Sequence, residues 1–206
     1  MKYWLMLIAL FFGLSAFNAC TPVEEEEEEE STLDTATHVE KEVADLAEAS
    51  IQLAEEYYDS VHAVLINPKG DRVGLATFTE TSEGVQVEVD GWSLPPGVHG
   101  LHIHEHGSCE APSFESAGGH YNPTEATHGF DHPQGPHAGD LPNIEVAEDG
   151  QLHVQVVGEM ISIQEGAKNN ILLDGGTSIM IHSQEDDYTS QPAGDAGERI
   201  ACGIIQ

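Results

Sequence analysis

Positive charge is nearly absent from this chain. Only six of the 206 residues are lysine or arginine, against 37 aspartates and glutamates, and the formal net charge is -31. Residues 20–60 carry 15 acids and one lysine, and residues 61–206 carry 22 acids and four bases, so the excess is spread over the chain. Binding to a phosphate backbone needs clustered lysines and arginines, so the composition argues against nucleic acid as a partner.

Long apolar runs are also scarce, and the one that stands out lies at the N-terminus. Lys2 precedes an almost unbroken apolar stretch over residues 3–17, which is short for a membrane span and is typical of an export signal over residues 1–19. Ala19 before Cys20 predicts cleavage and lipidation at Cys20. The predicted location is therefore a membrane-anchored lipoprotein of the bacterial cell envelope, facing the periplasm or the exterior. A plain cleaved signal that leaves Cys20 as a free thiol is the alternative.

Cysteine is rare as well, with three in the chain. If Cys20 carries a lipid, Cys109 and Cys202 are left as one candidate disulfide in an exported protein.

Two different segments follow the predicted signal. Residues 20–36 include seven consecutive glutamates, Glu24–Glu30, and predict a solvated linker, with a surface-display signal as the alternative. Residues 37–60 lack proline and glycine and predict a helix over 37–58, with an apolar seam at heptad spacing that Ser50 interrupts. A short coiled coil, a stalk helix and a helix docked on the domain are all open.

From Val61 onward the pattern changes to the period of two that is typical of strands. A hairpin is predicted over residues 61–79, with its turn at residues 67–71. Further short strands are predicted at 84–89, 100–104, 151–157, 171–173 and 178–182, which indicates an all-β antiparallel sandwich or barrel over residues 61–206. The stretch from 106 to 141 is rich in glycine, proline and histidine, and a loop of that length is expected to be functional or metal-bound.

The segment His102-Ile103-His104 carries the first chemical signal. Alternation along a strand places the two imidazoles on one face, and it turns Leu101 and Ile103 toward an apolar core. Two imidazoles at that spacing form half of a metal site.

The residues that complete such a site lie downstream. Imidazole suits both copper and zinc, and a carboxylate beside three imidazoles fits a closed tetrahedral zinc site, so a two-metal site is predicted. The candidate ligands are His102, His104, His120, His128, His137, Asp140 and His182.

Four motifs together resemble the copper/zinc superoxide dismutase family. They are the His-x-His strand, the turn at Gly118–Pro123, the spacing from His128 through His137 to Asp140, and the segment Gly197–Gly203. The resemblance runs from about Val61 to the C-terminus and implies a Greek-key β-sandwich or barrel with long metal-binding loops.

The resemblance also implies the cofactors and the reaction. Copper would be held by His102, His104, His120 and His182, and zinc by His120, His128, His137 and Asp140. The implied reaction is disproportionation of superoxide to dioxygen and hydrogen peroxide, with His120 bridging the metals and acting as a general acid. The family pairs the cysteines that correspond to Cys109 and Cys202.

Two further residues receive roles from the resemblance. Arg199 would orient superoxide at the copper site, against the alternative of a surface arginine beside Glu198. Asp186 would accept hydrogen bonds from His102 and His128, with Asp187 as its competitor.

The other histidines carry weaker signals. His99 matches a structural position, His106 and His132 are expected to be exposed rather than ligands, and His38, His62 and His153 have no partner pattern.

Residues 183–198 depart from the family pattern because they contain five acids and no lysine to attract superoxide. A redox-silent copper/zinc-binding lipoprotein that scavenges metal is the main alternative function, and a structural or adhesion module is another. The sequence leaves monomer and homodimer both open.

Overall fold

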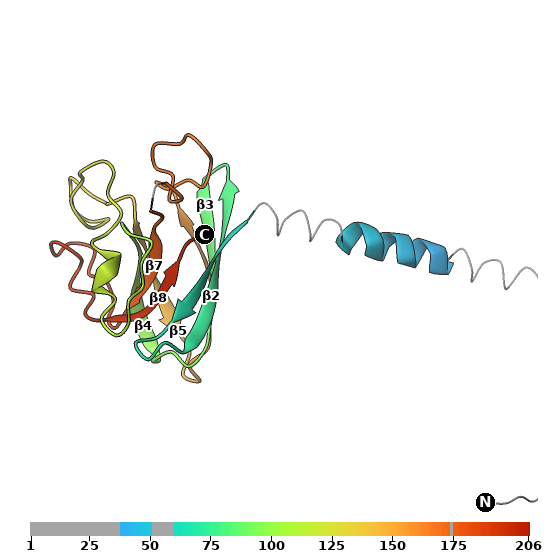
Figure 1. Ribbon diagram of the computed structural model, residues 1–206, viewed down its shortest axis with the longest axis horizontal. Coiled ribbons are helices and arrows are strands. Elements are labelled where there is room, and N and C mark those ends of the chain that lie inside the picture. The colour runs from blue at the N-terminus through green and yellow to red at the C-terminus, as the bar shows by residue number, and fades with distance from the viewer. Residues whose placement is uncertain (1–37, 51–59, 174) are drawn as a thin grey trace, which may run out of the picture. The chain divides into compact units, whose positions relative to one another are not determined.

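The computed structural model describes residues 38–50, 60–173 and 175–206, and the chain divides into two units, residues 1–51 and 52–206. In the first unit, residues 38–50 form the predicted helix, drawn in blue in Figure 1. The apolar seam of this helix is more than half exposed at Val39, Val43 and Leu46. The predicted continuation to residue 58, the signal segment and the acidic linker lie outside the described residues. No helix within the described parts of the chain combines the length and apolarity needed to cross a bilayer.

The second unit is an antiparallel β-barrel of eight strands, as the alternating patterns predicted. The strands are β1 (Val61–Ile66), β2 (Arg72–Thr81), β3 (Gly84–Gly91), β4 (Gly97–His104), β5 (Asp140–Val146), β6 (Leu152–Gly158), β7 (Ser178–His182) and β8 (Arg199–Ile204).

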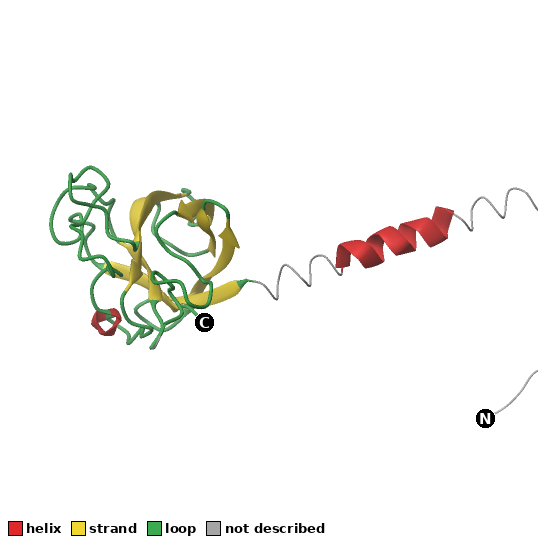
Figure 2. Cartoon of the chain, turned by 90° about the horizontal axis from the view of Figure 1, so that it is seen from above, coloured by secondary structure: helices red, strands yellow, loops and turns green. Residues whose placement is uncertain are grey.

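The strands form one sheet in the order β5-β4-β7-β8-β1-β2-β3-β6, which curls into a nearly closed ring (Figure 2). Sequential hairpins alone cannot give this order, because β4 lies between β5 and β7 and the return from β6 to β7 crosses the barrel. This is the Greek-key arrangement. Two long loops, residues 105–139 and 183–198, lie on one side of the barrel, and β2 and β3 lie on the other (Figure 1).

The strand predictions differ from the structure at three places: at residues 171–173, at β5 and at β8, and no predicted strand covers the last two. Residues 171–173 form a turn and not a strand, because the backbone of Ile171 donates to the Ser162 carbonyl and the buried Ile171 side chain fixes the loop instead. Strand β5 was missed because Pro142 interrupts its pattern. Proline is tolerated there because β5 lies at the end of the strand order and pairs with β4 alone.

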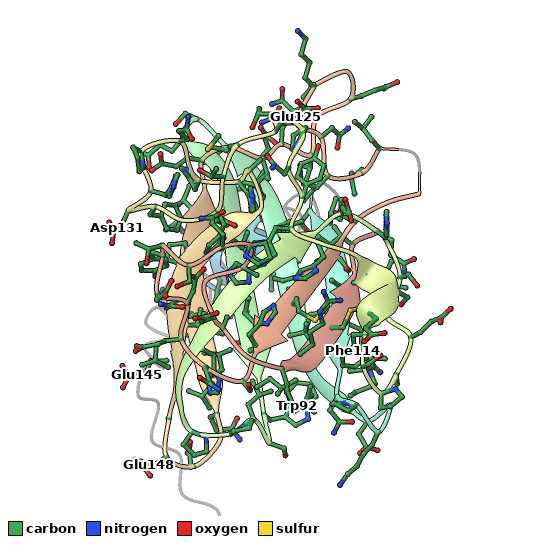
Figure 3. The ribbon with its side chains drawn as sticks, turned by 90° about the vertical axis from the view of Figure 1, so that its left-hand side faces the viewer. Trp92, Phe114, Glu125, Asp131, Glu145 and Glu148 are labelled. Atoms are coloured by element: carbon green, nitrogen blue, oxygen red, sulfur yellow. A yellow bond between two sulfur atoms is a disulfide. The ribbon has the colours of Figure 1, made fainter. Side chains whose placement is uncertain are left out.

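The core fills the inside of the barrel with inward-facing side chains from most of the strands, such as Leu65, Phe78 and Val87. A smaller buried cluster lies between the sheet and the loop that carries the short 3-10 helix η1 (Glu115–Ala117), and it includes Phe114, Met180 and Cys202. Figure 3 shows Phe114 beside this loop and shows Glu145 and Glu148 projecting from the surface. The second cluster holds the loop against the outer face of β7 and β8, where the functional side chains lie.

Candidate metal centre

Strand β4 contributes side chains both to the barrel core and to the candidate site, as the His-x-His pattern predicted. Leu101 and Ile103 are fully buried in the barrel core, and His102 and His104 occupy the other face of the same strand. These imidazoles are also buried, at 0% and 1% exposure, because the two long loops cover that face. A sheet face that holds polar rings out of water needs partners for every ring nitrogen.

Four histidines converge over this face from three parts of the chain. One nitrogen of each ring lies within 4.8 Å of the corresponding nitrogen of the others, and the rings belong to His102, His104, His120 and His182. His182 ends strand β7, the neighbour of β4, and His120 is joined to His104 by an isolated backbone bridge.

A second group of four donors shares His120. It consists of His120, His128, His137 and Asp140, again within 4.8 Å of one another. The Asp140 carboxylate is its centre: Oδ1 lies 2.8 Å from His120 Nδ1 and 3.3 Å from His137 Nδ1, and Oδ2 lies 3.1 Å from His128 Nδ1. The structure thus brings together all seven residues predicted as ligands, in the two sets that the resemblance implied.

Two backbone carbonyls determine which ring nitrogen of His104 and of His182 faces the first group. His104 Nδ1 lies 3.0 Å from the Gly118 carbonyl oxygen, and His182 Nδ1 lies 3.3 Å from that of Gly197. Their Nε2 atoms therefore point inward, where they approach to 3.4 Å. Backbone carbonyls that accept from the outer nitrogen of a ring set its tautomer and leave the inner nitrogen as a lone-pair donor.

Asp186 orients two more rings, one from each group. Its Oδ2 lies 2.7 Å from His102 Nε2, and its Oδ1 lies 3.0 Å from His128 Nε2. Asp186, and not its neighbour Asp187, makes these contacts, because Asp186 is buried and Asp187 is exposed. Gly194 packs against this pair so closely that a Cβ atom there would overlap the Asp186 carboxylate, and its φ of +67° also favours glycine.

The residues present fit two bound metal ions. Among the described residues, His102 Nδ1 and His120 Nε2 are buried without a hydrogen-bond partner. Each of these nitrogens belongs to a histidine of the two donor groups. Buried polar atoms without a partner are costly, and a coordinated cation removes that cost. All-imidazole and imidazole-plus-carboxylate donor sets suit copper and zinc, respectively.

The first group favours neutral imidazoles. Burial, together with the neighbouring rings His120 and His182, lowers the pKa of His104 to about 2. Burial likewise lowers the pKa of His182 to about 3 and that of His120 to about 4, although the Asp140 carboxylate opposes the shift of His120. A ligand must be deprotonated to bind a metal, so these rings are ready to coordinate at neutral pH.

In the second group, the two neighbouring carboxylates determine the direction of the pKa shift of His128. Burial acts to lower the pKa of His128, but hydrogen bonds to Asp140 and Asp186 outweigh it and raise that pKa to about 9. In return, the histidines hold the pKa values of both aspartates below their usual range against the opposing effect of burial. Both carboxylates therefore remain ionised, as a site for a divalent cation requires.

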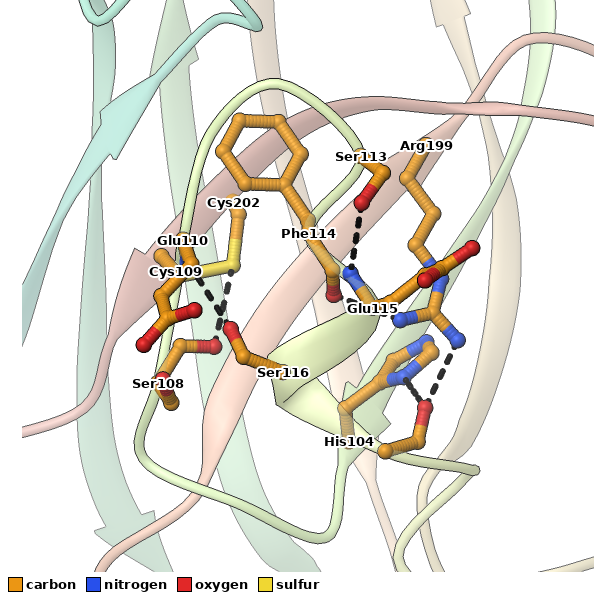
Figure 4. The surroundings of a disulfide bond; sticks show 11 residues. His104, Ser108, Cys109, Glu110, Ser113, Phe114, Glu115, Ser116, Arg199 and Cys202 are labelled. Carbon is orange, nitrogen blue, oxygen red and sulfur yellow. Dashed lines mark hydrogen bonds between the residues drawn. A yellow bond between two sulfur atoms is a disulfide. The ribbon is translucent and has the colours of Figure 1, made fainter.

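Arg199 lies at the edge of the first group, at the start of β8. Its Nη1 donates to the Phe114 carbonyl and its Nη2 to the Gly118 carbonyl, both at 2.6 Å (Figure 4). The guanidinium also lines an open pocket of about 630 Å³ together with Glu115 and Glu198. The alternative of an arginine engaged by Glu198 is not what the structure shows, because both hydrogen bonds go to backbone carbonyls of the η1 loop.

A disulfide joins Cys109 to Cys202, which are 93 positions apart in the sequence. It connects the η1 loop to β8, three residues from Arg199 (Figure 4). The bond therefore fastens the loop whose carbonyls hold the guanidinium.

The comparison with known protein families decides the family of the chain. Residues 72–205 match the family model described as copper/zinc superoxide dismutase (SODC). The chain belongs to the copper/zinc superoxide dismutase family. Copper and zinc are the cofactors of that family, and the two donor groups are consistent with both metals.

Similar members of the family come from bacteria. "Superoxide dismutase [Cu-Zn] 2" of Aquifex aeolicus is 47% identical over 146 residues, which span 70% of this chain and 85% of the relative. "Superoxide dismutase [Cu-Zn] 1" of the same organism is 43% identical over 76% of this chain and 92% of the relative. The crystal structure of a SOD-like protein from Bacillus subtilis has a TM-score of 0.69 and 45% identity, over 70% of this chain and 97% of the other.

The remaining histidines follow the sequence expectations only in part. His99 is buried below the site with its ring nitrogens 2.8 Å from the carbonyls of His182 and Pro95. Neither His106 nor His132 belongs to a donor group among the described residues. The sequence shows no partner pattern for His62 or His153, but His62 contacts Ser60 and Thr77, and His153 contacts Asp90 on the neighbouring strand.

Sequence reasoning missed residues that act through backbone or amide groups. The Gly118 carbonyl accepts from both His104 and Arg199, and the Asn143 side chain pairs with the backbone of Asp186 in both directions. The Gln191 side chain similarly bonds the backbone of His128. No residue type predicts such contacts, since any residue could supply the Gly118 carbonyl.

Proposed function

We propose that this chain converts superoxide into dioxygen and hydrogen peroxide, with copper held by the four-histidine group and zinc by the group around Asp140. The reaction consumes two superoxide ions and two protons and yields one dioxygen and one hydrogen peroxide. When bound, copper supplies the one-electron chemistry, whereas zinc has no redox chemistry. The observation that carries the proposal is the meeting of the two donor groups at His120, beside an arginine fixed by two carbonyls.

His120 is proposed to hold both groups together and to move a proton. Its Nδ1 faces Asp140 Oδ1 at 2.8 Å, and its Nε2 is buried among the other three rings without a hydrogen-bond partner in the described chain. An imidazole in this position can take up a proton at Nε2 and deliver it to the reduced substrate as a general acid. Asp140 keeps the ring oriented while the proton moves.

Arg199 is proposed to orient superoxide. The guanidinium is permanently charged and has five N–H donors, of which two are engaged by Phe114 and Gly118. The remaining donors can bind a small anion next to His104. Two carboxylates, Glu115 and Glu198, line the same pocket as Arg199. The attraction of superoxide to the guanidinium is therefore opposed by the negative charge of these carboxylates.

A superoxide-consumption assay on the reconstituted protein tests this function, together with metal analysis of the same sample. We expect one copper and one zinc per chain in the buried centre and rapid consumption of superoxide. A redox-silent metal-binding role is the second candidate, because a relative 45% identical to this chain is named only "superoxide dismutase-like". Full copper and zinc content without turnover would favour that scavenger role.

We further propose that the protein is exported and anchored by a lipid on Cys20, with the acidic segment as a linker. An apolar run over residues 3–17 that ends at Ala19-Cys20 supports this proposal. The mass of the mature protein should correspond to a chain that begins at a lipid-modified Cys20, and Cys20→Ser should release the protein from membranes. An unmodified mature N-terminus would remove the anchor and leave the enzymatic proposal intact.

A further inference from the structure

A third group of side chains that could bind a metal ion lies on the outer face of the barrel, on strands β3 and β6. Glu88 and Asp90 alternate with the buried Val87 and Val89, so both point outward from β3. His153 lies on β6 directly opposite Asp90 in the ladder. These strands are on the side of the barrel opposite the loops that cover the buried centre (Figure 1).

The three side chains already converge. His153 Nδ1 lies 2.7 Å from Asp90 Oδ1 and 4.0 Å from Glu88 Oε1, and one donor atom of each side chain lies within 4.8 Å of the other two. The three positions are set by a continuous antiparallel ladder of seven residue pairs between β3 and β6. The spacing of the donors therefore depends on the sheet and not on a loop.

We propose that Glu88, Asp90 and His153 form a third, exposed site for Zn²⁺. One imidazole nitrogen and two carboxylate oxygens are ligands that zinc accepts, with water in the fourth position. Zinc bonds of about 2.0–2.2 Å separate tetrahedral ligands by about 3.3–3.6 Å, between the two distances present here. Rotation of exposed side chains covers the difference without movement of the strands.

A neighbouring residue prepares the Glu88 carboxylate for this role. Gln155, opposite Glu88 in the ladder, donates from Nε2 to Glu88 Oε2 at 3.0 Å. That bond engages the oxygen turned away from His153 and leaves Oε1 facing the imidazole. Outer contacts of this kind orient ligands and strengthen metal binding.

The charge around the cluster also favours a cation. Within the described residues, no lysine or arginine lies at ion-pair distance from Glu88 or Asp90, and the chain carries a formal net charge of -31. Side chains of His153 and Asp90 are 70% and 56% exposed, so a bound ion would exchange with solution. The site would therefore serve as an exchangeable zinc reserve at the surface, in contrast to the buried centre.

Zinc titration of the protein with its buried centre already filled tests this proposal. Isothermal titration calorimetry should detect one additional zinc per chain. Asp90→Asn and His153→Asn should each weaken it by about tenfold or more. Glu145→Gln is the matched control for Asp90→Asn, because Glu145 is an exposed strand residue whose substitution removes the same single charge.

A second measurement identifies the ligand directly. The ring resonances of His153, assigned by their loss in His153→Asn, should shift on addition of zinc to the wild-type protein and not to Asp90→Asn. The proposal is overturned if no additional zinc binds, or if Asp90→Asn and His153→Asn bind it as tightly as the control. Because neither readout depends on superoxide, the result is independent of the proposed enzymatic function.

Discussion

Arg199 and His104 share one acceptor, the carbonyl oxygen of Gly118. Arg199 Nη2 donates to it at 2.6 Å, and His104 Nδ1 lies 3.0 Å from it. The residue proposed to orient the substrate and a proposed copper ligand are therefore positioned by the same backbone atom. A shift of the η1 loop would displace both together.

Arg199→Lys should lower kcat/KM for superoxide by about tenfold or more while copper and zinc content stay unchanged. A lysine cannot donate to two carbonyls in a fixed fork and still present charge to the substrate. Arg72→Lys is the control, because Arg72 is the only other arginine of the chain and lies at the exposed start of β2. Full activity of Arg199→Lys and Arg199→Ala at low superoxide would contradict the assigned role.

Asp186→Asn should weaken zinc binding by about ten- to a hundredfold. An asparagine has one oxygen, so it cannot accept from both His102 and His128, and one ring loses its orientation. Competition with a zinc chelator measures the change. Asp187→Asn is the matched control, since Asp187 is exposed and its carboxylate accepts from Thr189 and Ser190 of its own turn. Equal zinc affinities of the two variants would argue against the bridging role of Asp186.

The metal-free protein should be most stable near pH 6.5. The folded pKa values of His104, His120 and His182 lie below the usual value, so the unfolded chain binds more protons as the pH falls from 6.5 to 4. Stability is then lost by up to about 1.4 kcal/mol per pH unit for each ring.

His128 has the opposite sign, because its folded pKa is raised to about 9. Its contribution is complete below pH 6.5 and is lost as the pH rises toward 9. Urea unfolding of the metal-free protein at pH 5, 6.5 and 9 measures the loss of stability on both sides of the maximum. His128→Asn should reduce the loss of stability between pH 6.5 and 9. A steady rise in stability from pH 5 to 9 would be inconsistent with these shifts.

Replacing both Cys109 and Cys202 by serine should lower the free energy of unfolding by about 2–5 kcal/mol. The bond closes a long loop, because the cysteines are 93 positions apart in the sequence, and so restricts the unfolded chain. Activity should also fall, because the freed η1 loop supplies the two carbonyls that hold Arg199. Urea unfolding and the superoxide assay on the same variant measure both effects, and unchanged stability would show that the barrel needs no such constraint.

Activity should rise between low and moderate ionic strength, by a factor of about two to ten. Salt screens the long-range repulsion between superoxide and a chain of net charge -31. Glu115→Gln should reduce this salt dependence more than Glu148→Gln, because Glu115 lines the pocket of Arg199 and Glu148 does not. A decrease in activity over the whole range would mean that the local field of Arg199 dominates.

Much of the site could be predicted because its signals are local. Alternation along a strand determines that His102 and His104 share a face and that Leu101 and Ile103 enter the core. The family motifs then placed the other ligands and the cysteine pair. The β5 strand escaped prediction because Pro142 is compatible with a strand only at the end of a sheet, and strand order is not a local property.

The sequence by itself determined an acidic, all-β chain, because composition and short-range periodicity decide these features, and its resemblance to the family implied the seven ligands. Between Asp186, which the resemblance favoured, and its competitor Asp187, only the tertiary structure could decide, since the contact with both groups depends on which side chain the 183–198 loop buries. It likewise decided that His153 faces Asp90. The register of β3 and β6 joins residues 63 positions apart, and no local pattern encodes that pairing.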